Sequence, residues 1–310
     1  MKPLKAISDT KGVFLTIEDL VYYSYVARNI HLRKNAKVNS IMAGRHASRL
    51  RGRGMDFEES RAYVKGDDIR NIDWKVTARL QKTHTKVFQE EKEHPAVIVV
   101  DLSKSMFFGS KRNMKSVCAA QIAAIMAYKI SGDGDRVGGI VFNDDSVEMI
   151  KPKRDKKSML HFLEKVVEKN NLLAEISSEK SIEETRNKVF EQLHSLVSHD
   201  YTMVVISDFK RYDSRVLQTL VTASLHNNVI VFKIYDELEM QIPGERIAIS
   251  DGENQIEING KDKNTQNTIK TEFESKQKEF IEELNAYKIP VFLIETETPV
   301  EEQIRTQLGL

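Results

Sequence analysis

The hydrophobic pattern from residue 95 onward alternates between two kinds of segment. Short runs of β-branched residues, typical of strands buried on both faces, recur between longer stretches in which apolar residues follow helical spacing. Strands are expected at HPAVIVVDLS, VGGIVF, SVEMI, TMVVISDF, VIVFKIY and IPVFLIET, a hairpin at IAISDGENQIEIN, and helices near residues 111–130, 156–169, 181–198, 212–226, 264–286 and 299–310. This alternation predicts an α/β fold, with a doubly wound, mostly parallel sheet covered by helices on both faces.

The first 94 residues do not follow this rhythm. A helix is expected near residues 17–33, followed by the basic, glycine-punctuated stretch AGRHASRLRGRGMDF. Residues 57–94 contain short alternating runs, which suit strands or an extended arm better than a helix. We therefore divide the chain into a basic N-terminal extension of helix and short strands, residues 1–94, and an α/β domain that ends in the hairpin and helices, residues 95–310.

Composition places the protein among soluble globular proteins, with 40% hydrophobic and 30% charged residues. A single cysteine, Cys118, cannot form an internal disulfide, which fits a reducing compartment. The N-terminus has no apolar run of signal-peptide length, and no run reaches the roughly 20 residues that span a bilayer. We expect a cytoplasmic protein without a transmembrane segment.

Charge is unevenly distributed along the chain. Residues 1–95 carry 19 Lys and Arg against 12 Asp and Glu, whereas the rest carries 28 against 34. The basic part either contacts an acidic partner or only solvates the surface. The glycine-spaced Arg51 and Arg53 favour partner contact, and Arg61 fits either interpretation. Binding of nucleic acid through this basic arm is a further alternative.

The segment GDDIRNIDWKVTAR combines dense charge with the only tryptophan. Trp74 and Arg70 could form an interaction hot spot, because Trp and Arg are favoured there. Alternatively, Trp74 anchors the N-terminal arm on the core while Arg70 pairs with neighbouring aspartates. Both interpretations remain open at the level of sequence.

Two polar clusters follow buried strands of the predicted sheet. Asp101, Ser103 and Ser105 form a D-x-S-x-S pattern directly after one strand, and Asp208 follows another. Ligands of such folds bind beyond the carboxyl ends of the strands, so these side chains are expected to meet. Carboxylate and hydroxyl oxygens suit Mg²⁺, or Mn²⁺ or Ca²⁺ in its place. The alternative is that these residues only cap a helix beginning near Lys111.

The same pattern weakens an enzymatic interpretation. A phosphatase-like site commonly has a second Asp two positions after the first, where this chain has Ser103. No His or Lys obviously completes a catalytic set, and no phosphate-binding GxxxxGK[ST] loop occurs. A site with few protein charges keeps a divalent cation electrophilic, which favours docking of an external carboxylate over chemistry. A metal-dependent phosphoester hydrolase remains the enzymatic alternative.

The stretch RGRGMDFEESRAYVKGDDIRNIDWKVTARLQKTHTKVFQEEKEHPAVIVVDLSKSMFFGS closely resembles the signature of domain-of-unknown-function family 58. The resemblance implies a von Willebrand factor A-like fold and a metal-ion-dependent adhesion site. It assigns to that site Asp101, Ser103, Ser105, a hydroxyl from a middle loop, and Asp208. It also implies a bacterial protein that acts with a MoxR-type AAA+ ATPase, in a chaperone-like role, to mature, assemble or insert metal into other proteins.

One departure from the family pattern concerns the middle-loop hydroxyl. Related sites usually have a threonine in a Gly-Gly-Thr-like loop, and the corresponding place here is ISSEKSIEET. Ser181 is the first choice for this ligand, followed by Ser178 and then Thr185. The fifth ligand, and with it the affinity for metal, is therefore the least determined part of the predicted site.

Overall fold

A computed structural model describes residues 12–29, 55–90, 95–175, 182–210, 213–240, 246–250, 255–259 and 263–308. The contacts divide the chain into two compact units. The larger unit, here called the sheet domain, comprises Met1–Met42 and His94–Leu310, and the smaller unit comprises Ala43–Glu93. The sequence-based division at residue 94 had assigned the first helix to the extension, whereas its contacts place it in the sheet domain.

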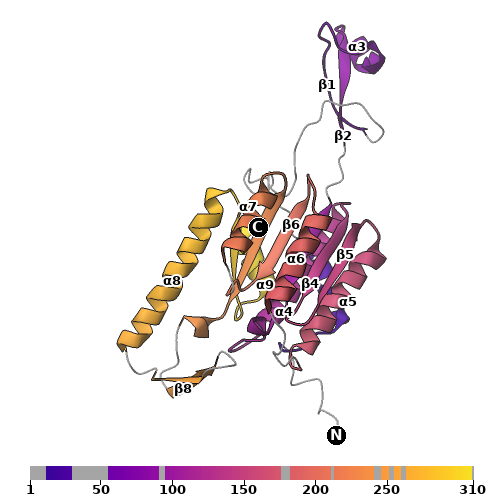
Figure 1. The fold of residues 1–310 in the computed structure, drawn as a ribbon. Helices are drawn as coiled ribbons and strands as arrows, with labels where there is room; N and C mark the ends of the chain where they lie inside the picture. Colours follow the sequence, from indigo (N-terminus) through magenta and orange to yellow (C-terminus); the bar gives the residue numbers. More distant parts are fainter. Residues whose placement is uncertain are drawn as a thin grey trace. The chain divides into compact units, whose positions relative to one another are not determined.

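A six-stranded sheet forms the centre of the sheet domain (Figure 1). Its strand order is β10-β7-β6-β3-β4-β5, and all neighbours are parallel except the antiparallel edge pair of β4 and β5. The strands are β3 (Ala96–Asp101), β4 (Val137–Phe142), β5 (Val147–Lys153), β6 (Thr202–Ser207), β7 (Asn228–Tyr235) and β10 (Val291–Glu295). The predicted α/β class with a mostly parallel sheet is confirmed.

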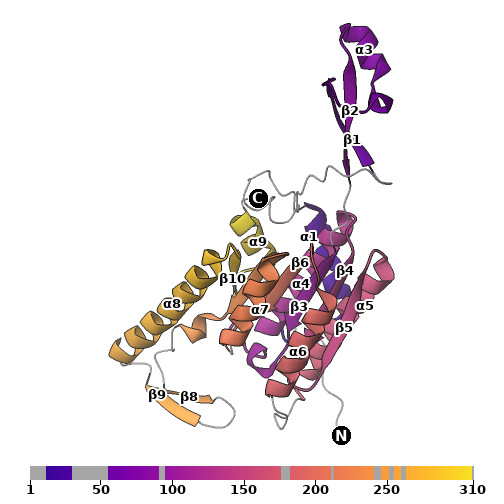
Figure 2. The ribbon, with the colours of Figure 1, turned by 45° about the horizontal axis from the view of Figure 1, so that its top comes forward.

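Helices cover both faces of this sheet, as Figures 1 and 2 show. One face packs against α1 (Ile17–Asn29), α4 (Lys115–Gly132), α5 (Lys156–Leu172) and α9 (Val300–Leu308). The other packs against α6 (Ile182–Leu196), α7 (Ser214–Ser224) and α8 (Lys263–Ala286). Strand β3 explains why both faces need covering. Val97 and Val99 belong to one core cluster and Ile98 and Val100 to the other, and all four are buried.

Helix α4 forms the interior of its layer and is almost entirely buried. Its many alanines allow close packing against the sheet, which fits the predicted small-residue helix. It begins at Lys115, four residues later than the sequence pattern indicated. The intervening residues form a loop in which Met114 N–H and Lys115 N–H donate to backbone carbonyls of Gly12 and Phe108.

Gly139 permits the close approach of α5 to the sheet. A Cβ atom at this position would lie 2.3 Å from the carbonyl oxygen of Ile98 and 2.4 Å from the ring of Phe162. Phe162 is completely buried. A glycine on β4 is therefore required for this aromatic ring to approach the strand so closely.

The predicted hairpin is present as the antiparallel pair β8 (Arg246–Ser250) and β9 (Gln255–Asn259). The smaller unit consists of the antiparallel pair β1 (Met55–Ala62) and β2 (His84–Glu90), the short helix η2 (Ile69–Asn71) and helix α3 (Trp74–Leu80). The two strands fit the expectation for residues 57–94, but α3 was missed. Asp73 caps this helix by accepting a hydrogen bond from Val76 N–H.

No helix in the described ranges is both long and apolar enough to cross a bilayer.

Candidate functional site

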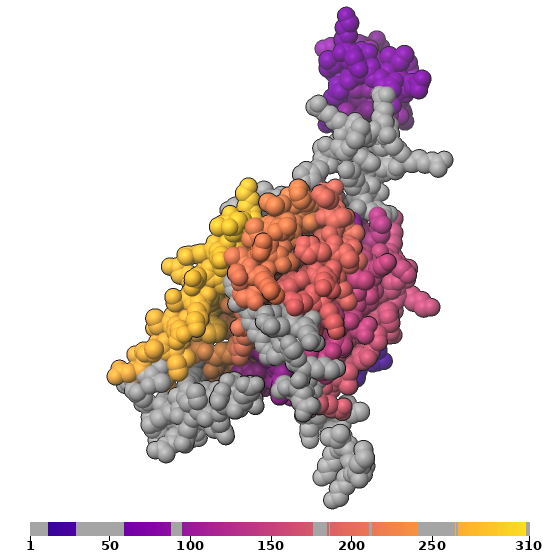
Figure 3. Space-filling view, in the orientation of Figure 1, coloured from indigo at the N-terminus to yellow at the C-terminus, as the bar shows by residue number. Residues whose placement is uncertain are grey.

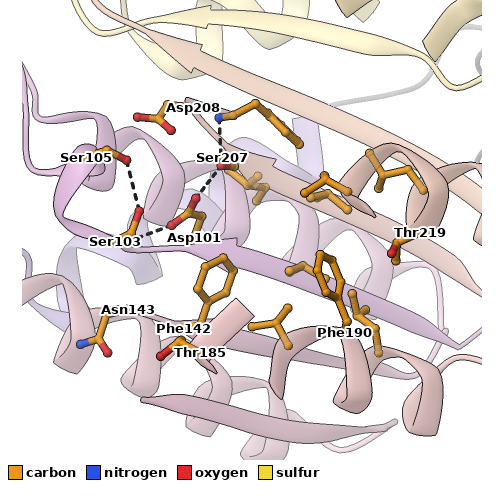
Figure 4. A pocket seen from close by; sticks show the side chains of 18 of the residues that line it. Asp101, Ser103, Ser105, Phe142, Asn143, Thr185, Phe190, Ser207, Asp208 and Thr219 are labelled. Carbon is orange, nitrogen blue, oxygen red and sulfur yellow. Dashed lines mark hydrogen bonds between the residues drawn. The ribbon is translucent and has the colours of Figure 1, made fainter. Parts of the chain in front are cut away.

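Loops after three neighbouring strands converge at the carboxyl end of the sheet. Asp101 ends β3, Asp144 follows β4, and Asp208 follows β6. All three are buried and line one cavity together with Ser103 and Ser105 (Figure 4). The predicted meeting of the D-x-S-x-S loop with the SDF loop is thus present in the fold.

Asp101 is a buried carboxylate that accepts hydrogen bonds from neutral donors. The backbone N–H of Ser103 donates to Oδ1 at 2.9 Å, and the Ser207 hydroxyl donates to Oδ2 at 2.5 Å. Within the described residues, no lysine, arginine or histidine forms an ion pair with it. Burial, reinforced by the neighbouring charge of Asp208, raises the pKa of Asp101 from 3.8 to about 6. The carboxylate therefore carries a negative charge at neutral pH that the surrounding protein compensates poorly.

Asp208, in contrast, has a built-in counter-charge. The Lys115 ammonium, whose side chain is completely buried, lies 2.6 Å from Asp208 Oδ2 and 2.9 Å from Glu239 Oε1. Despite burial, this ammonium and the Lys210 N–H, which donates to Oδ1 at 3.0 Å, hold the pKa of Asp208 below its ordinary value. The exposed Lys210 side chain completes the network through a 2.8 Å ion pair with Glu239. The site thus pairs a neutralised carboxylate with an uncompensated one.

Hydroxyl groups supply the remaining oxygens near Asp101. Ser103 Oγ and Ser105 Oγ lie 3.2 Å apart, and Figure 4 shows both beside Asp101. Thr185, the least favoured of the three middle-loop candidates, lines the same cavity, and its hydroxyl donates to the backbone carbonyl of Asp144 at 3.0 Å. Ser181 and Ser178 lie outside the described residues.

The helix-cap explanation of the D-x-S-x-S pattern is wrong for helix α4. The residue before its first turn is Met114, and no side chain caps that end. Asp101 instead closes a local turn onto Ser103 N–H, while Ser103 begins the short helix η3 (Lys104–Met106) without a side-chain cap. The loop is held in place by Lys104 N–H, which donates to Asp144 Oδ2 at 2.6 Å.

The cavity has a volume of about 110 Å³. It extends from the oxygen atoms of Asp101, Ser103 and Ser105 to apolar side chains of helices α6 and α7. Figure 4 shows Phe190 and Thr219 at the end opposite Ser103 and Ser105. In the described ranges, no three His, Cys, Asp or Glu side chains lie close enough together to hold a metal without other ligands. A cation at this site therefore depends on the hydroxyls as well as the carboxylates.

Sequence reasoning missed Lys115, Ser207 and Glu239. Ser207 directly precedes Asp208 and could have been found by extending the motif backward by one residue. Lys115 carries no such signal, because a lysine in the first turn of a helix is normally solvated. Its ammonium lies 2.6 Å from Asp208, although no lysine was recognised near either loop from the sequence.

The residues predicted to contact a partner all belong to the smaller unit. Arg51 and Arg53 lie outside the described residues. Arg61 forms a two-pronged ion pair with Asp67, at 2.7 and 2.9 Å, and Arg70 is exposed. Trp74 is 70% exposed, so its ring is not buried in a core of the smaller unit.

Other large apolar side chains of the smaller unit are exposed as well as Trp74. Val64, Ile69 and Leu80 are 61%, 67% and 50% exposed.

The sequence of this chain is similar to those of several known proteins. Three uncharacterized mycobacterial proteins, from Mycobacterium bovis and two strains of Mycobacterium tuberculosis, are 32% identical over 134 residues. The match spans 43% of this chain and 42% of each relative, which is less than half of either.

Two solved structures cover 70% of this chain. One is the conserved hypothetical protein BatB of Bacteroides thetaiotaomicron, with 16% identity, a TM-score of 0.42 and 97% of that chain covered. The other is an aerotolerance-related membrane protein of Bacteroides fragilis, with 17% identity, a TM-score of 0.38 and 98% covered. The family model described as "Protein of unknown function DUF58" matches residues 59–280, which is most of the chain, and the protein therefore belongs to that family.

Proposed function

We propose that the protein is a non-enzymatic, metal-dependent docking module of the von Willebrand factor A type. The observation that carries this proposal is the buried Asp101 carboxylate, which receives only neutral hydrogen-bond donors within the described part of the chain. Burying an uncompensated charge is costly, so such a carboxylate is stabilised by a bound cation. Its partner carboxylate Asp208 already has the Lys115 ammonium, so one cation is required rather than two.

The donor set fits a hard divalent cation such as Mg²⁺, Mn²⁺ or Ca²⁺. Asp101, Ser103, Ser105 and Asp208 offer carboxylate and hydroxyl oxygens around one cavity, with the Thr185 hydroxyl as a further candidate. Ser181 stays a candidate ligand on the strength of the sequence resemblance. When bound, the metal would supply an electrophilic centre that accepts a carboxylate from outside. Lys115 lowers the negative charge of the site and thereby keeps the affinity for metal moderate.

The resemblance of the sequence motif to its family supports the choice of partner. We propose that a MoxR-type AAA+ ATPase binds the protein in the cytoplasm during the maturation or assembly of other proteins. The exposed Trp74, Arg70 and Arg61 of the smaller unit are proposed as a second contact surface, together with Arg51 and Arg53. Trp and Arg side chains dominate the energetics of many interfaces.

The experiment that tests this function is affinity capture from the source cell with Mg²⁺ or with EDTA. The chain is compared with Asp101→Ala and with Asp133→Ala, a matched control in which the lost carboxylate is exposed at the end of α4. We expect an ATPase retained by the parent chain and by Asp133→Ala only with metal, and lost in Asp101→Ala. Retention that ignores both the metal and Asp101 would refute metal-dependent docking.

A metal-dependent phosphoester hydrolase is the second candidate, and Lys115 is the observation that favours it. Phosphoryl-transfer sites commonly place an ammonium beside their carboxylates. Here, however, the ammonium is completely buried and already paired with Asp208 and Glu239, so it is not exposed to a substrate. Turnover of p-nitrophenyl phosphate with Mg²⁺ or Mn²⁺ that disappears in Asp101→Asn would establish the hydrolase and displace the docking proposal.

A further inference from the structure

The metal site proposed above uses only one end of its cavity. The other end is lined by apolar side chains from both neighbouring helices and from the middle of the sheet, including Val189, Phe190, Val205 and Leu220. Neither the oxygen cluster nor the exposed surface of the smaller unit accounts for this space.

The space results from how α6 and α7 cover the sheet. Helix α6 packs on β4 and β5, whereas α7 packs on β7, so the central strands β3 and β6 lie between the two helices. Figure 3 views the sheet domain from the side that carries these helices. Val205 in the middle of β6 is only half-buried, whereas its neighbours Val204 and Ile206, whose side chains face the opposite side of the sheet, are completely buried. Apolar surface at the centre of a sheet is normally covered, so its accessibility marks a binding pocket.

The size of the cavity limits what can fill it. Its volume is about 110 Å³. An apolar cavity of about 150 Å³ in another protein holds one benzene molecule, so the smaller space here suits one aliphatic side chain no larger than leucine. Three residues on its wall, Phe142, Phe190 and Thr219, are only half-buried.

The two ends of the cavity together define one ligand. We propose that the cavity binds the bulky apolar side chain of a partner peptide segment whose adjacent carboxylate is held at the oxygen cluster. This inference rests on the proposed function, because Asp101 and Asp208 repel a carboxylate unless a divalent cation lies between. The apolar end supplies hydrophobic binding energy and selects against acidic segments that lack a large neighbouring side chain.

Three small probes separate the contributions of the two ends. N-acetyl-leucine carries both the carboxylate and the side chain, N-acetyl-leucinamide lacks the charge, and N-acetylglycine lacks the side chain. Binding to the full chain is followed by methyl NMR of Val205 and Leu220, with Mg²⁺ and with EDTA. We expect N-acetyl-leucine to shift these methyl signals and to bind about tenfold more tightly with Mg²⁺ than without it.

Variants that fill the cavity provide the matched comparison. Thr219→Trp places a large ring at the cavity wall, and Val205→Phe fills it from the sheet should the first variant perturb α7. Gln218→Trp is the control, because residue 218 is exposed on the same helix and does not line the cavity. Filling variants are expected to lose N-acetyl-leucine binding and to keep Mg²⁺ binding, and the control to keep both.

Each remaining outcome decides a specific point. N-acetylglycine that binds as tightly as N-acetyl-leucine would overturn the apolar subsite and leave metal-dependent docking intact. N-acetyl-leucinamide that binds as tightly as the acid, with or without Mg²⁺, would overturn the joint recognition of both groups. No methyl shift with any probe, in a chain that still binds Mg²⁺ through Asp101, refutes this inference alone. A chain whose spectrum does not respond to Mg²⁺ refutes the proposed function as well.

Discussion

Replacing Lys115 with methionine tests the charge balance of the site most directly. The substitution keeps the length and apolar stem of the side chain and removes only the ammonium. Asp208 and Glu239, which lie 2.6 and 2.9 Å from Nζ, then lose their shared buried counter-charge. Removing one partner of a buried ion pair costs about 3–5 kcal/mol, because the remaining charge is desolvated without compensation.

This loss is large enough to measure in a thermal or urea experiment. For a unit of the size of the sheet domain, about 3–5 kcal/mol corresponds to a fall in Tm of about 6–20 °C. Circular dichroism at 222 nm follows the sheet domain, which contains the long helices, whereas the fluorescence of Trp74 follows the smaller unit. Only the first signal is expected to shift.

Lys111→Met is the matched control for this experiment. Lys111 also pairs with two carboxylates, Glu237 at 2.8 Å and Glu297 at 2.7 Å, but its side chain is 62% exposed. Water screens exposed pairs, so this variant is expected to stay close to the parent chain. If Lys115→Met were as stable as Lys111→Met, the buried ammonium would not be the counter-charge of Asp208, and the reasoning about the site would be refuted.

Three further predictions concern other features of the molecule. In metal-free protein, the contribution of Asp101 to the free energy of unfolding should fall by about 3 kcal/mol as pH rises from 3.8 through about 6. The raised pKa of Asp101 makes its ionisation unfavourable in the fold, at about 1.4 kcal/mol per pKa unit, so this contribution is the difference between the pH curves of the parent chain and of Asp101→Asn. Asp101→Asn should lack this fall in urea titrations, and parallel pH curves for the two chains would contradict the buried charge. Gly139→Ala should destabilise the sheet domain by about 1–3 kcal/mol in calorimetry, since its Cβ meets Ile98 and Phe162, and an unchanged Tm would show that the strand yields easily. Trp74→Ala should change stability by less than about 0.5 kcal/mol because the ring is exposed, while weakening capture of the partner; unimpaired capture would exclude the ring from the interface.

The sequence by itself determined the architecture of the sheet domain. Alternating apolar runs and helical periodicities are local patterns, and each one reports how a segment is buried whatever its neighbours are. The two polar clusters at Asp101 and Asp208 were found in the same way, because carboxyl ends of parallel strands meet at one edge. Helix α3 escaped notice because it has only seven residues, too few for a helical period to stand out from the strands on either side.

The charge balance and the cavity were decided by the tertiary structure alone. Lys115 and Glu239 are 124 residues apart, and only the packing of α4 against the sheet brings both to Asp208. The cavity depends on where α6 and α7 lie over β3 and β6, a property of spacing between helices that no single segment encodes. Trp74 also could not be assigned from sequence, because a tryptophan in a charged segment fits both a core anchor and a contact residue. Its exposure depends on which surfaces the rest of the chain covers, and that is a property of the folded molecule.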